Sequence, residues 1–402
     1  MINNNQIKSG LYMIEPYLVG YNGHAFNYAK SIQDALKNSE VEYKIFVSKD
    51  CETNILDNIN GVPLFDPVPS EKHFSTIFGK LFFSIFIFNK HLYQGLKKIS
   101  NKFDLNNKTI FFGTIQHIHF FGLFLWLITS KKENKPLKII LTLRLSIYRY
   151  DKNRWALPYF WYLLGLKLIN SIKNKYKIYL ITDSQKLVTE FARVTSQKIQ
   201  LLPIPHTHKL NNNFDNHKLI ISSLGGARKN KGVDLIIDAI IDLSRDNIFK
   251  NIDFIIQSNC HENDNYMKSK INLLRSYKFD NVKILDSALS EDDYYKIFNK
   301  TDIVLIPYDL GIYYANTSGI FTEATSMGKP VIVTRDTWMS DNLSNNCGLL
   351  INNRDSDDLV LKIKSMVLKY NEYKIASELN AKNWNNYHNP NNFINELLKI
   401  GL

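Results

Sequence analysis

The chemistry of this chain is most visible in residues 317–333, which read Thr-Ser-Gly-Ile-Phe-Thr-Glu-Ala-Thr-Ser-Met-Gly-Lys-Pro-Val-Ile-Val. The pattern predicts that Thr317, Ser318 and Gly319 form a turn that opens a helix, and that a buried strand follows the Gly-Lys-Pro break. The free N–H groups and the positive dipole end of such a helix attract phosphate. Glu323, about one turn further along the helix, can accept hydrogen bonds from ribose hydroxyls. Phosphate beside ribose predicts a nucleotide site.

A second glycine-rich segment, residues 224–239, reads Leu-Gly-Gly-Ala-Arg-Lys-Asn-Lys-Gly-Val-Asp-Leu-Ile-Ile-Asp-Ala. It follows a predicted strand and opens a predicted helix, and Gly225 and Gly226 let the backbone approach a ligand closely. Arg228 and Lys231 bring positive charge to the carboxyl end of the strand, the edge where open α/β sheets bind ligands. We therefore expect this loop to contact the phosphates of the predicted nucleotide. The alternative interpretation is a solvated basic turn.

Both segments resemble the donor-site signature of retaining GT-B glycosyltransferases, in particular glycosyltransferase family 4 (glycosyl transferases group 1). The matching runs are Ser-Gly-Ile-Phe-Thr-Glu-Ala, then Met-Gly-Lys-Pro-Val-Ile, and also Lys231-Gly232-x-Asp234. The resemblance implies that Lys231 and Arg228 stabilise charge on a departing nucleoside diphosphate and that Glu323 binds the ribose. It also implies sugar transfer with retention of configuration, from a nucleotide-diphosphate sugar such as a UDP-sugar, with neither a metal nor another cofactor.

The chain departs from the family pattern at two positions. The arginine of the family falls where this chain has Gly226, so Arg228 replaces it only if the loop bends differently. The first glutamate of the family motif, which contacts the donor sugar, falls on Ala315. Other groups must then recognise the sugar. The alternative function is a non-catalytic nucleotide- or glycan-binding protein derived from a glycosyltransferase.

The N-terminal half offers further candidates after three predicted strands. A Gly-Tyr-Asn-Gly-His run ends at Gly23 and His24, where the family has a glycine-rich loop that faces donor phosphates and acceptor. We expect Gly23 to contact the donor and His24 the acceptor. His117 and His119 share one face in extended structure, with no third metal ligand evident, and we expect His117 to line the active site. Arg144 is expected to contact the acceptor.

Strand-like apolar runs alternate with helix-like segments along the whole chain, and 402 residues exceed what one core usually supports. We expect an α/β protein of the GT-B fold, with two Rossmann-like doubly wound domains facing a central cleft. Residues 1–205 would bind the acceptor and residues 206–375 the nucleotide sugar. Residues 376–402 would form a helix that crosses back to the N-terminal domain. No Gly-x-Gly-x-x-Gly fingerprint follows a strand, which argues against a nicotinamide-dependent oxidoreductase.

The net charge of +12 is concentrated in the N-terminal half. Residues 1–205 hold 27 Lys and Arg against 14 Asp and Glu, a difference of +13, whereas the remainder holds 23 against 24, a difference of −1. This imbalance predicts an anionic partner for the first half. Because no nucleic-acid recognition motif is evident, we do not expect nucleic acid to be that partner.

Residues 78–96 and 120–129 are rich in apolar and aromatic side chains and lie close to lysines. Both are too short or too interrupted to span a membrane. They are either core helices or parts of a surface that dips into anionic lipid, and the charge excess favours the second interpretation. A basic, aromatic surface also favours a glycan or lipid-linked acceptor, as in bacterial lipopolysaccharide or capsule synthesis.

The chain has a polar N-terminus and only three cysteines, which lie far apart. This predicts a reduced, cytoplasmic setting, with peripheral attachment to the inner face of the cytoplasmic membrane.

Overall fold

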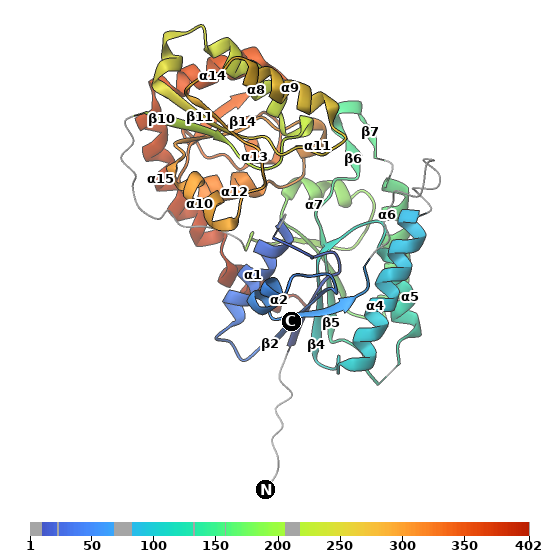
Figure 1. Cartoon of the computed structure of the whole chain (residues 1–402). Helices are drawn as coiled ribbons and strands as arrows, with labels where there is room; N and C mark the ends of the chain where they lie inside the picture. Colours follow the sequence, from blue (N-terminus) through green and yellow to red (C-terminus); the bar gives the residue numbers. More distant parts are fainter. Residues whose placement is uncertain are drawn as a thin grey trace. The chain divides into compact units, whose positions relative to one another are not determined.

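The structure is a computed structural model that describes residues 10–21, 24–67, 83–131, 133–156, 158–205 and 218–401. The chain forms two compact units (Figure 1). The first comprises Met1–Arg149, Asn153–His206 and Asn389–Leu402. The second comprises Tyr150–Lys152 and Thr207–His388.

A seven-stranded parallel sheet forms the centre of the first unit, in the order β3-β2-β1-β4-β5-β8-β9. Its strands are β1 (Gly10–Glu15), β2 (Glu42–Ser48), β3 (Gly61–Phe65), β4 (Lys108–Ile115), β5 (Lys138–Leu143), β8 (Ile178–Thr182) and β9 (Ile199–Leu201). The interior strand β5 reads Lys-Ile-Ile-Leu-Thr-Leu and is buried throughout, as expected for a parallel strand covered on both faces. A short antiparallel pair, β6 (Tyr148–Arg149) and β7 (Arg154–Trp155), lies outside this sheet.

Helices cover this sheet, and some of them pack against one another in chain order. They are α1 (His24–Leu36), α2 (Thr53–Ile59), η2 (Phe83–Ile87), α4 (Phe88–Lys102), α5 (Phe120–Thr129), α6 (Tyr159–Ser171), α7 (Gln185–Phe191) and α16 (Pro390–Lys399). The short helix η3 (Tyr150–Lys152) is counted with the second unit. Helix α4 packs on α5, and α5 packs on α6. Within the described part of the chain, no helix combines the length and apolarity needed to cross a membrane.

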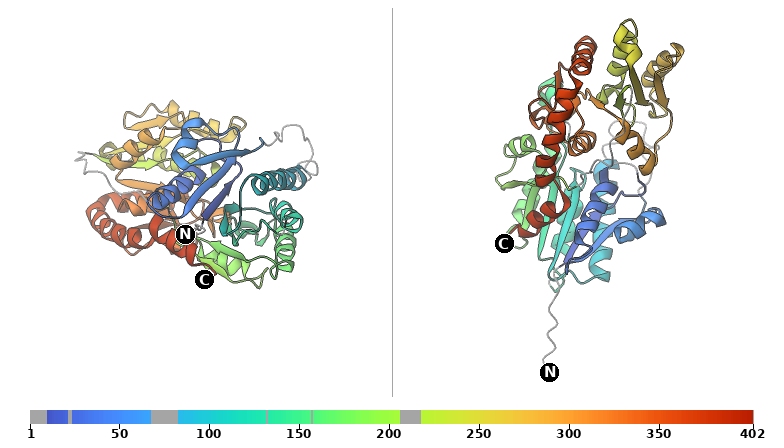
Figure 2. Two further views of the ribbon diagram at one scale, coloured as in Figure 1. Left: turned by 90° about the horizontal axis from the view of Figure 1, so that it is seen from below. Right: turned by 90° about the vertical axis from the view of Figure 1, so that its left-hand side faces the viewer.

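The last helix of the chain, α16, is part of the core of the first unit (Figure 2). The Phe393 ring packs against the rings of Tyr28 and Phe111, with centroids 5.4 and 6.1 Å apart. Beneath it, the buried ammonium of Lys138 at the start of β5 donates hydrogen bonds to the carbonyl oxygens of Leu398 and Ile400, at 2.8 and 2.6 Å. These carbonyls lack partners within the helix, and the lysine therefore anchors the end of α16 to the sheet.

A six-stranded parallel sheet forms the second unit, in the order β12-β11-β10-β13-β14-β15. Its strands are β10 (Leu219–Ser223), β11 (Ile252–Gln257), β12 (Val282–Leu285), β13 (Ile303–Ile306), β14 (Val331–Thr334) and β15 (Gly348–Ile351). Its helices are η4 (Lys229–Lys231), α8 (Val233–Leu243), η5 (Asn247–Asn251), α9 (Asn265–Ser276), α10 (Glu291–Lys300), α11 (Leu310–Tyr313), α12 (Gly319–Ser326), α13 (Trp338–Asp341), α14 (Ser356–Leu368) and α15 (Tyr370–Tyr387).

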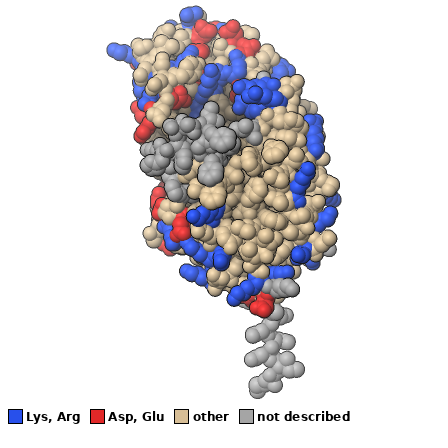
Figure 3. Space-filling view, turned by 90° about the vertical axis from the view of Figure 1, so that its right-hand side faces the viewer, with Lys and Arg blue, Asp and Glu red and all other residues tan. Residues whose placement is uncertain are grey.

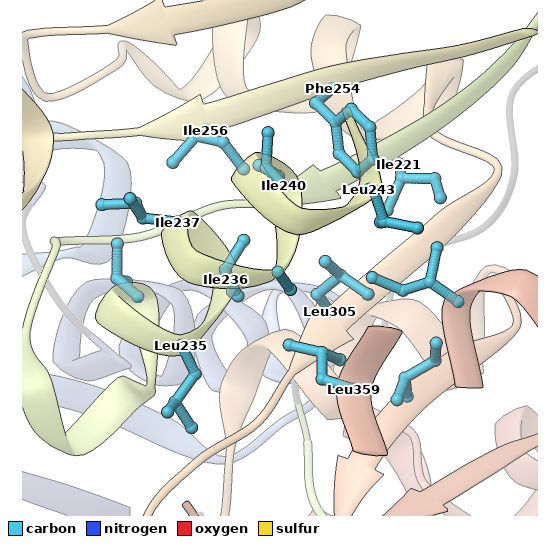
Figure 4. Close-up of a cluster of buried hydrophobic side chains, with 14 of the residues drawn as sticks. Ile221, Leu235, Ile236, Ile237, Ile240, Leu243, Phe254, Ile256, Leu305 and Leu359 are labelled. Atoms are coloured by element: carbon cyan, nitrogen blue, oxygen red, sulfur yellow. The ribbon is translucent and has the colours of Figure 1, made fainter. Parts of the chain in front are cut away.

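Helix α8 supplies much of the core of this unit. Its isoleucines and leucines recur at helical spacing and are buried against the sheet and α14 (Figure 4). Ile236 and Ile240 of α8 are fully buried together with Ile221 and Phe254 of the neighbouring strands. This packing fixes the start of α8, and with it the loop that carries Lys231. The predicted fold class, two doubly wound α/β domains with parallel sheets, is confirmed.

Replacing Lys138 with methionine should destabilise the protein by about 1–3 kcal/mol, because buried carbonyl groups lose their hydrogen-bond donor. Urea unfolding measures the change, and limited proteolysis should show earlier cleavage near α16. Lys399→Met is the matched control, since the Lys399 side chain is mostly exposed and pairs with Glu396 on the surface; it should change stability by no more than about 0.5 kcal/mol. Equal stability of both variants would contradict the anchoring role.

Candidate active site

In the second unit, the predicted donor residues lie in loops at the carboxyl edge of the sheet. The loop after β10 carries Gly225 to Lys231, and the segment after β13 leads to Ser318 and α12. An added Cβ at Gly225 would lie 2.9 Å from the Lys231 ammonium and 3.0 Å from the Ile320 side chain. Gly225, with φ of +92°, therefore brings the two loops into contact, so the structure assembles residues that are about ninety positions apart in the sequence.

Helix α12 begins as its sequence predicts. Ser318 has an extended backbone, and its Oγ accepts a hydrogen bond from the Phe321 N–H at 3.3 Å. The Ser318 side chain is buried, at 3% exposure. This N-cap fixes the helix start next to Gly225. Thr317 and Gly319 flank the cap, and the positive end of the helix dipole lies at this edge.

Lys231 is held in a mostly dry position. Its Nζ lies 5.7 Å from the centre of the Tyr308 ring. Burial lowers the pKa of Lys231 to about 8, the nearby Arg228 adds to this, and Glu323 opposes it. The next residue, Gly232, has φ of +67°, and a Cβ there would lie 2.2 Å from the carbonyl oxygen of Pro307. A glycine is therefore required immediately after the lysine.

Glu323 is buried on α12, at 5% exposure, and accepts a hydrogen bond on Oε2 from the Tyr294 hydroxyl at 2.5 Å. Burial raises the pKa of Glu323 to about 7, while the Tyr294 hydrogen bond and the Lys231 charge oppose the rise. Tyr294, on α10, was not predicted as a site residue. It reaches Glu323 from a different helix, so the residue spacing around Glu323 could not indicate it.

A buried ion pair holds the loop that carries Lys231. Asp234, 1% exposed, accepts hydrogen bonds from the Arg354 guanidinium, one of them at 3.0 Å, and from the Tyr266 hydroxyl at 3.0 Å. Arg354 also donates to the Lys229 carbonyl oxygen at 2.9 Å. Burial raises the pKa of Asp234, but the Arg354 and Tyr266 contacts outweigh it and hold the pKa below its usual value. The aspartate of the Lys-Gly-x-Asp run is thus a loop brace.

Gln257, at the end of β11, ties the neighbouring loops together. Its Oε1 accepts a hydrogen bond from the Gly225 N–H at 2.6 Å, and its Nε2 donates to the Ser287 carbonyl oxygen at 3.4 Å. The Ala227 N–H donates to the Asn259 carbonyl oxygen at 2.8 Å. The loops after β10, β11 and β12 therefore form one connected frame.

The two departures from the family pattern have structural counterparts. Arg228 is exposed, and its charge lowers the pKa of Lys231, as expected for neighbouring cations. A Cβ at Gly226 would meet only ordinary contacts, the nearest at 3.5 Å, and Arg228 Nε would lie 3.9 Å away. The Ala315 side chain is fully buried.

The remaining candidates belong to the first unit. Gly23 lies outside the described residues, and His24 begins α1 without its side chain being described. His117 is half-buried on the turn after β4, with its ring 5.8 Å from that of Tyr162. Burial lowers the pKa of His117 to about 4, so its ring is neutral at physiological pH. His119 is engaged at both nitrogens, by the Gln116 N–H and the Tyr17 hydroxyl.

Arg144 lies just after β5, in a group of polar residues at the carboxyl edge of the first sheet. Its Nη1 is 3.5 Å from Asp183 Oδ2, and its guanidinium lies 4.2 Å from the centre of the Tyr28 ring. Glu15, at the end of β1, is the third member: burial raises its pKa to about 8, and Arg144 opposes the rise. Arg144 Nε and Asp183 Oδ1 are buried without a hydrogen-bond partner in the described part of the chain. Of this group the sequence analysis proposed only Arg144 as a ligand contact.

Comparison with known proteins points to one family. Residues 218–368 match the family model described as Glycosyl transferases group 1. No curated protein sequence matches the chain significantly.

Solved structures match nearly the whole chain. Sucrose-phosphate synthase from Thermosynechococcus elongatus is 12% identical with a TM-score of 0.69, and the match covers 98% of each chain. HepE from Anabaena, solved in complex with UDP, is 12% identical with a TM-score of 0.66, and the match covers 97% of this chain and 99% of that one. A glycosyltransferase from Rickettsia africae is 15% identical with a TM-score of 0.65, covering 98% and 97%.

At these identities the structural likeness shows the fold alone, and the family match covers part of the second unit. The second unit therefore resembles the glycosyl transferases group 1 family over residues 218–368, and the chain as a whole has the GT-B fold seen in these solved structures.

Proposed function

We propose that this glycosyltransferase moves a sugar from a nucleoside-diphosphate donor, a UDP-sugar, to a glycan or lipid-linked acceptor with retention of configuration. One observation carries the proposal: the ammonium of Lys231 and the capped first turn of α12 both adjoin Gly225, and the buried carboxylate of Glu323 lies further along the same helix. The cation suits the diphosphate and the carboxylate suits the ribose. UDP is favoured as the leaving group because HepE, a structural neighbour, was solved with UDP and with UDP-glucose.

Charge stabilisation is the proposed source of catalysis. As the sugar–phosphate bond breaks, negative charge grows on the diphosphate. Lys231, Arg228 and the N–H groups from Thr317 to Gly319 would neutralise it. Because Lys231 is mostly buried, its charge acts in a medium of low dielectric constant, where each interaction is stronger than in water. The departing phosphate can itself accept the proton of the acceptor hydroxyl, so that no protein base is needed.

The polar group around Arg144 is the proposed acceptor contact in the first unit. Asp183 balances the arginine charge, and a Glu15 with a pKa of about 8 is mostly protonated at neutral pH. A nearly neutral set of donors and acceptors suits hydroxyl groups better than phosphate. We also propose that neutral His117 contacts the acceptor or sugar, and that Gly23 and His24 contact donor and acceptor as the family resemblance implies.

The proposed setting is synthesis of a bacterial surface polysaccharide, such as lipopolysaccharide or capsule. The basic first half of the chain, +13 by sequence, supports an acceptor that carries or adjoins negative charge. We propose that the enzyme works in the cytoplasm at the inner face of the cytoplasmic membrane.

A non-catalytic nucleotide- or glycan-binding protein is the second candidate, because the family's first glutamate is replaced by the buried Ala315. The two proposals separate in one assay: incubation with UDP-sugars, followed by detection of free UDP. Slow release of UDP without acceptor supports an enzyme. Thermal stabilisation by UDP without any release under the same conditions supports the binding protein.

Replacing Lys231 with methionine should lower sugar transfer by about two to three orders of magnitude, because the transition state loses a preorganised positive charge. Lys229→Met, in the same loop with an exposed side chain, is the matched control and should keep most of the activity. Turnover numbers measured with saturating donor make the comparison. Equal activity of both variants would contradict the role of Lys231.

The affinity for a UDP-sugar should be bell-shaped in pH, with its maximum between about pH 7 and 8. Below the raised pKa of Glu323 the carboxyl is protonated and accepts ribose hydroxyls poorly, so affinity rises through pH 7. Above the lowered pKa of Lys231 the ammonium is lost, so affinity falls as the pH increases further. Calorimetry across this range measures both limbs.

Two variants assign the limbs of this profile. Glu323→Gln should remove the acid limb, and Lys231→Met should remove the alkaline limb. The other groups that act on this pair, Arg228, Tyr294 and Glu291, should shift the limbs without removing either. A profile that keeps its acid limb in Glu323→Gln would refute the assignment of that limb.

A further inference from the structure

Two helices of the first unit join their apolar side chains into one surface. Helix α5 packs beside α6, and the rings of Phe121 and Trp161 meet edge to face at 6.0 Å. The α5–α6 face is defined here by seven partly or fully exposed apolar side chains: Phe121, Phe124, Leu125, Ile128, Phe160, Trp161 and Leu164. In each helix they recur at the three- and four-residue spacing of one helix side.

Several large apolar side chains of this face are strongly exposed to solvent. Leu125, Ile128 and Phe160 are 43%, 53% and 61% exposed. Helix α5 reads Phe-Phe-Gly-Leu-Phe-Leu-Trp-Leu-Ile-Thr and contains no charged residue, although only its other side is buried in the protein. A helix that is apolar all round normally lies in a core or in contact with lipid. Isolated surface apolar residues need no explanation, but a contiguous set does.

Positive charge predominates in the stretch of sequence that carries the α5–α6 face, although Lys108 and Lys138 within that stretch are buried elsewhere in the unit. Between residues 83 and 177 the sequence holds 17 Lys and Arg and three acidic residues, Asp104, Glu133 and Asp151. Lys131 follows α5, and Lys167 on α6 is exposed. Figure 3 looks at the side where α4, α5 and α6 lie in Figure 1 and shows a broad uncharged area with blue side chains along its margin.

We propose that the α5–α6 face docks on an anionic lipid bilayer, its apolar side chains entering the boundary of the acyl chains while the surrounding lysines contact the headgroups. This combination of apolar insertion and basic margin is what an interfacial surface requires. A second copy of the chain is a poorer occupant, because a two-fold contact would bring two basic margins together. The inference rests on the proposed function only for the purpose of docking, which is to bring the enzyme to a lipid-linked acceptor at the membrane.

The test is cosedimentation of the full chain with vesicles of phosphatidylcholine, with or without phosphatidylglycerol. The wild-type protein should bind the anionic vesicles, bind the neutral ones weakly, and lose binding as salt increases. The double variant Leu125→Ser with Ile128→Ser should bind the anionic vesicles about tenfold more weakly or worse, because two apolar side chains no longer leave water. Phe160→Ser is a second, independent variant from the other helix.

Ile375→Ser with Leu379→Ser is the matched control. These residues are 60% and 60% exposed on α15 of the second unit, where the surrounding charge is mixed, and their replacement should leave vesicle binding unchanged. Equal loss in both double variants, equal binding to neutral vesicles, or self-association that disappears in the α5 variant without any vesicle binding would each overturn the proposal.

Thermal stabilisation by UDP, measured on the same variants, separates this inference from the proposed function. A variant that keeps the UDP response but loses vesicle binding supports membrane docking and leaves the donor site intact. A wild-type protein that responds to UDP and ignores anionic vesicles refutes the docking proposal alone.

Discussion

A lysine in the loop after β10 and a glutamate on helix α12, both kept away from water, determine how the rest of the second unit is built. Neither Lys231 nor Glu323 would keep its charge easily in a dry place, and their altered pKa values express that cost. Each lowers the cost for the other. The rest of the unit supplies what the pair cannot: a glycine on each side of the lysine loop, a tyrosine on the carboxylate, and the brace between Asp234 and Arg354 that keeps the loop in register. A bound anionic ligand would supply negative charge that balances Lys231 and Arg228.

The first unit uses the same edge of the same kind of sheet in a different way. Glu15, Arg144 and Asp183 each come at or just after the end of a strand, so parallel topology alone brings them together. Here the cation is balanced within the protein, whereas in the second unit Lys231 lies in the fields of both a second cation, Arg228, and the carboxylate of Glu323. One architecture thus places two neighbouring cations beside a carboxylate in one unit and a nearly neutral polar group in the other. This difference supports the proposed division between a charged donor and a hydroxyl-bearing acceptor.

Most of the second unit could be predicted from its sequence, because its signals are local. Apolar runs at Ile252–Gln257 and Ile303–Ile306, a capping serine at Ser318 and a Lys-Gly turn each report on their own neighbourhood. The edge strand β15 was not predicted: it has four residues and little to distinguish it from a loop.

The unpredicted parts of the site depend on contacts between distant segments. Tyr294 reaches Glu323 from 29 positions away, and Arg354 reaches Asp234 from 120. No spacing rule in a single sequence links such pairs. The same holds in the first unit, where the sequence indicates Arg144 as a candidate but no spacing links it to its partner Asp183, 39 positions further along.

The anchoring of α16 by Lys138 gives the first unit a discontinuous sequence, since its core includes residues from the two ends of the chain. During synthesis on the ribosome, the strands and helices up to residue 205 emerge long before Phe393 exists. The apolar surface formed by Tyr28 and Phe111 must then stay uncovered while the entire second unit is made. Synthesis of the first unit therefore begins before that of the second unit, but its core is completed only after the second unit has been made. Its exposed intermediate is the species that chaperones would meet and that truncation near the C-terminus would make permanent.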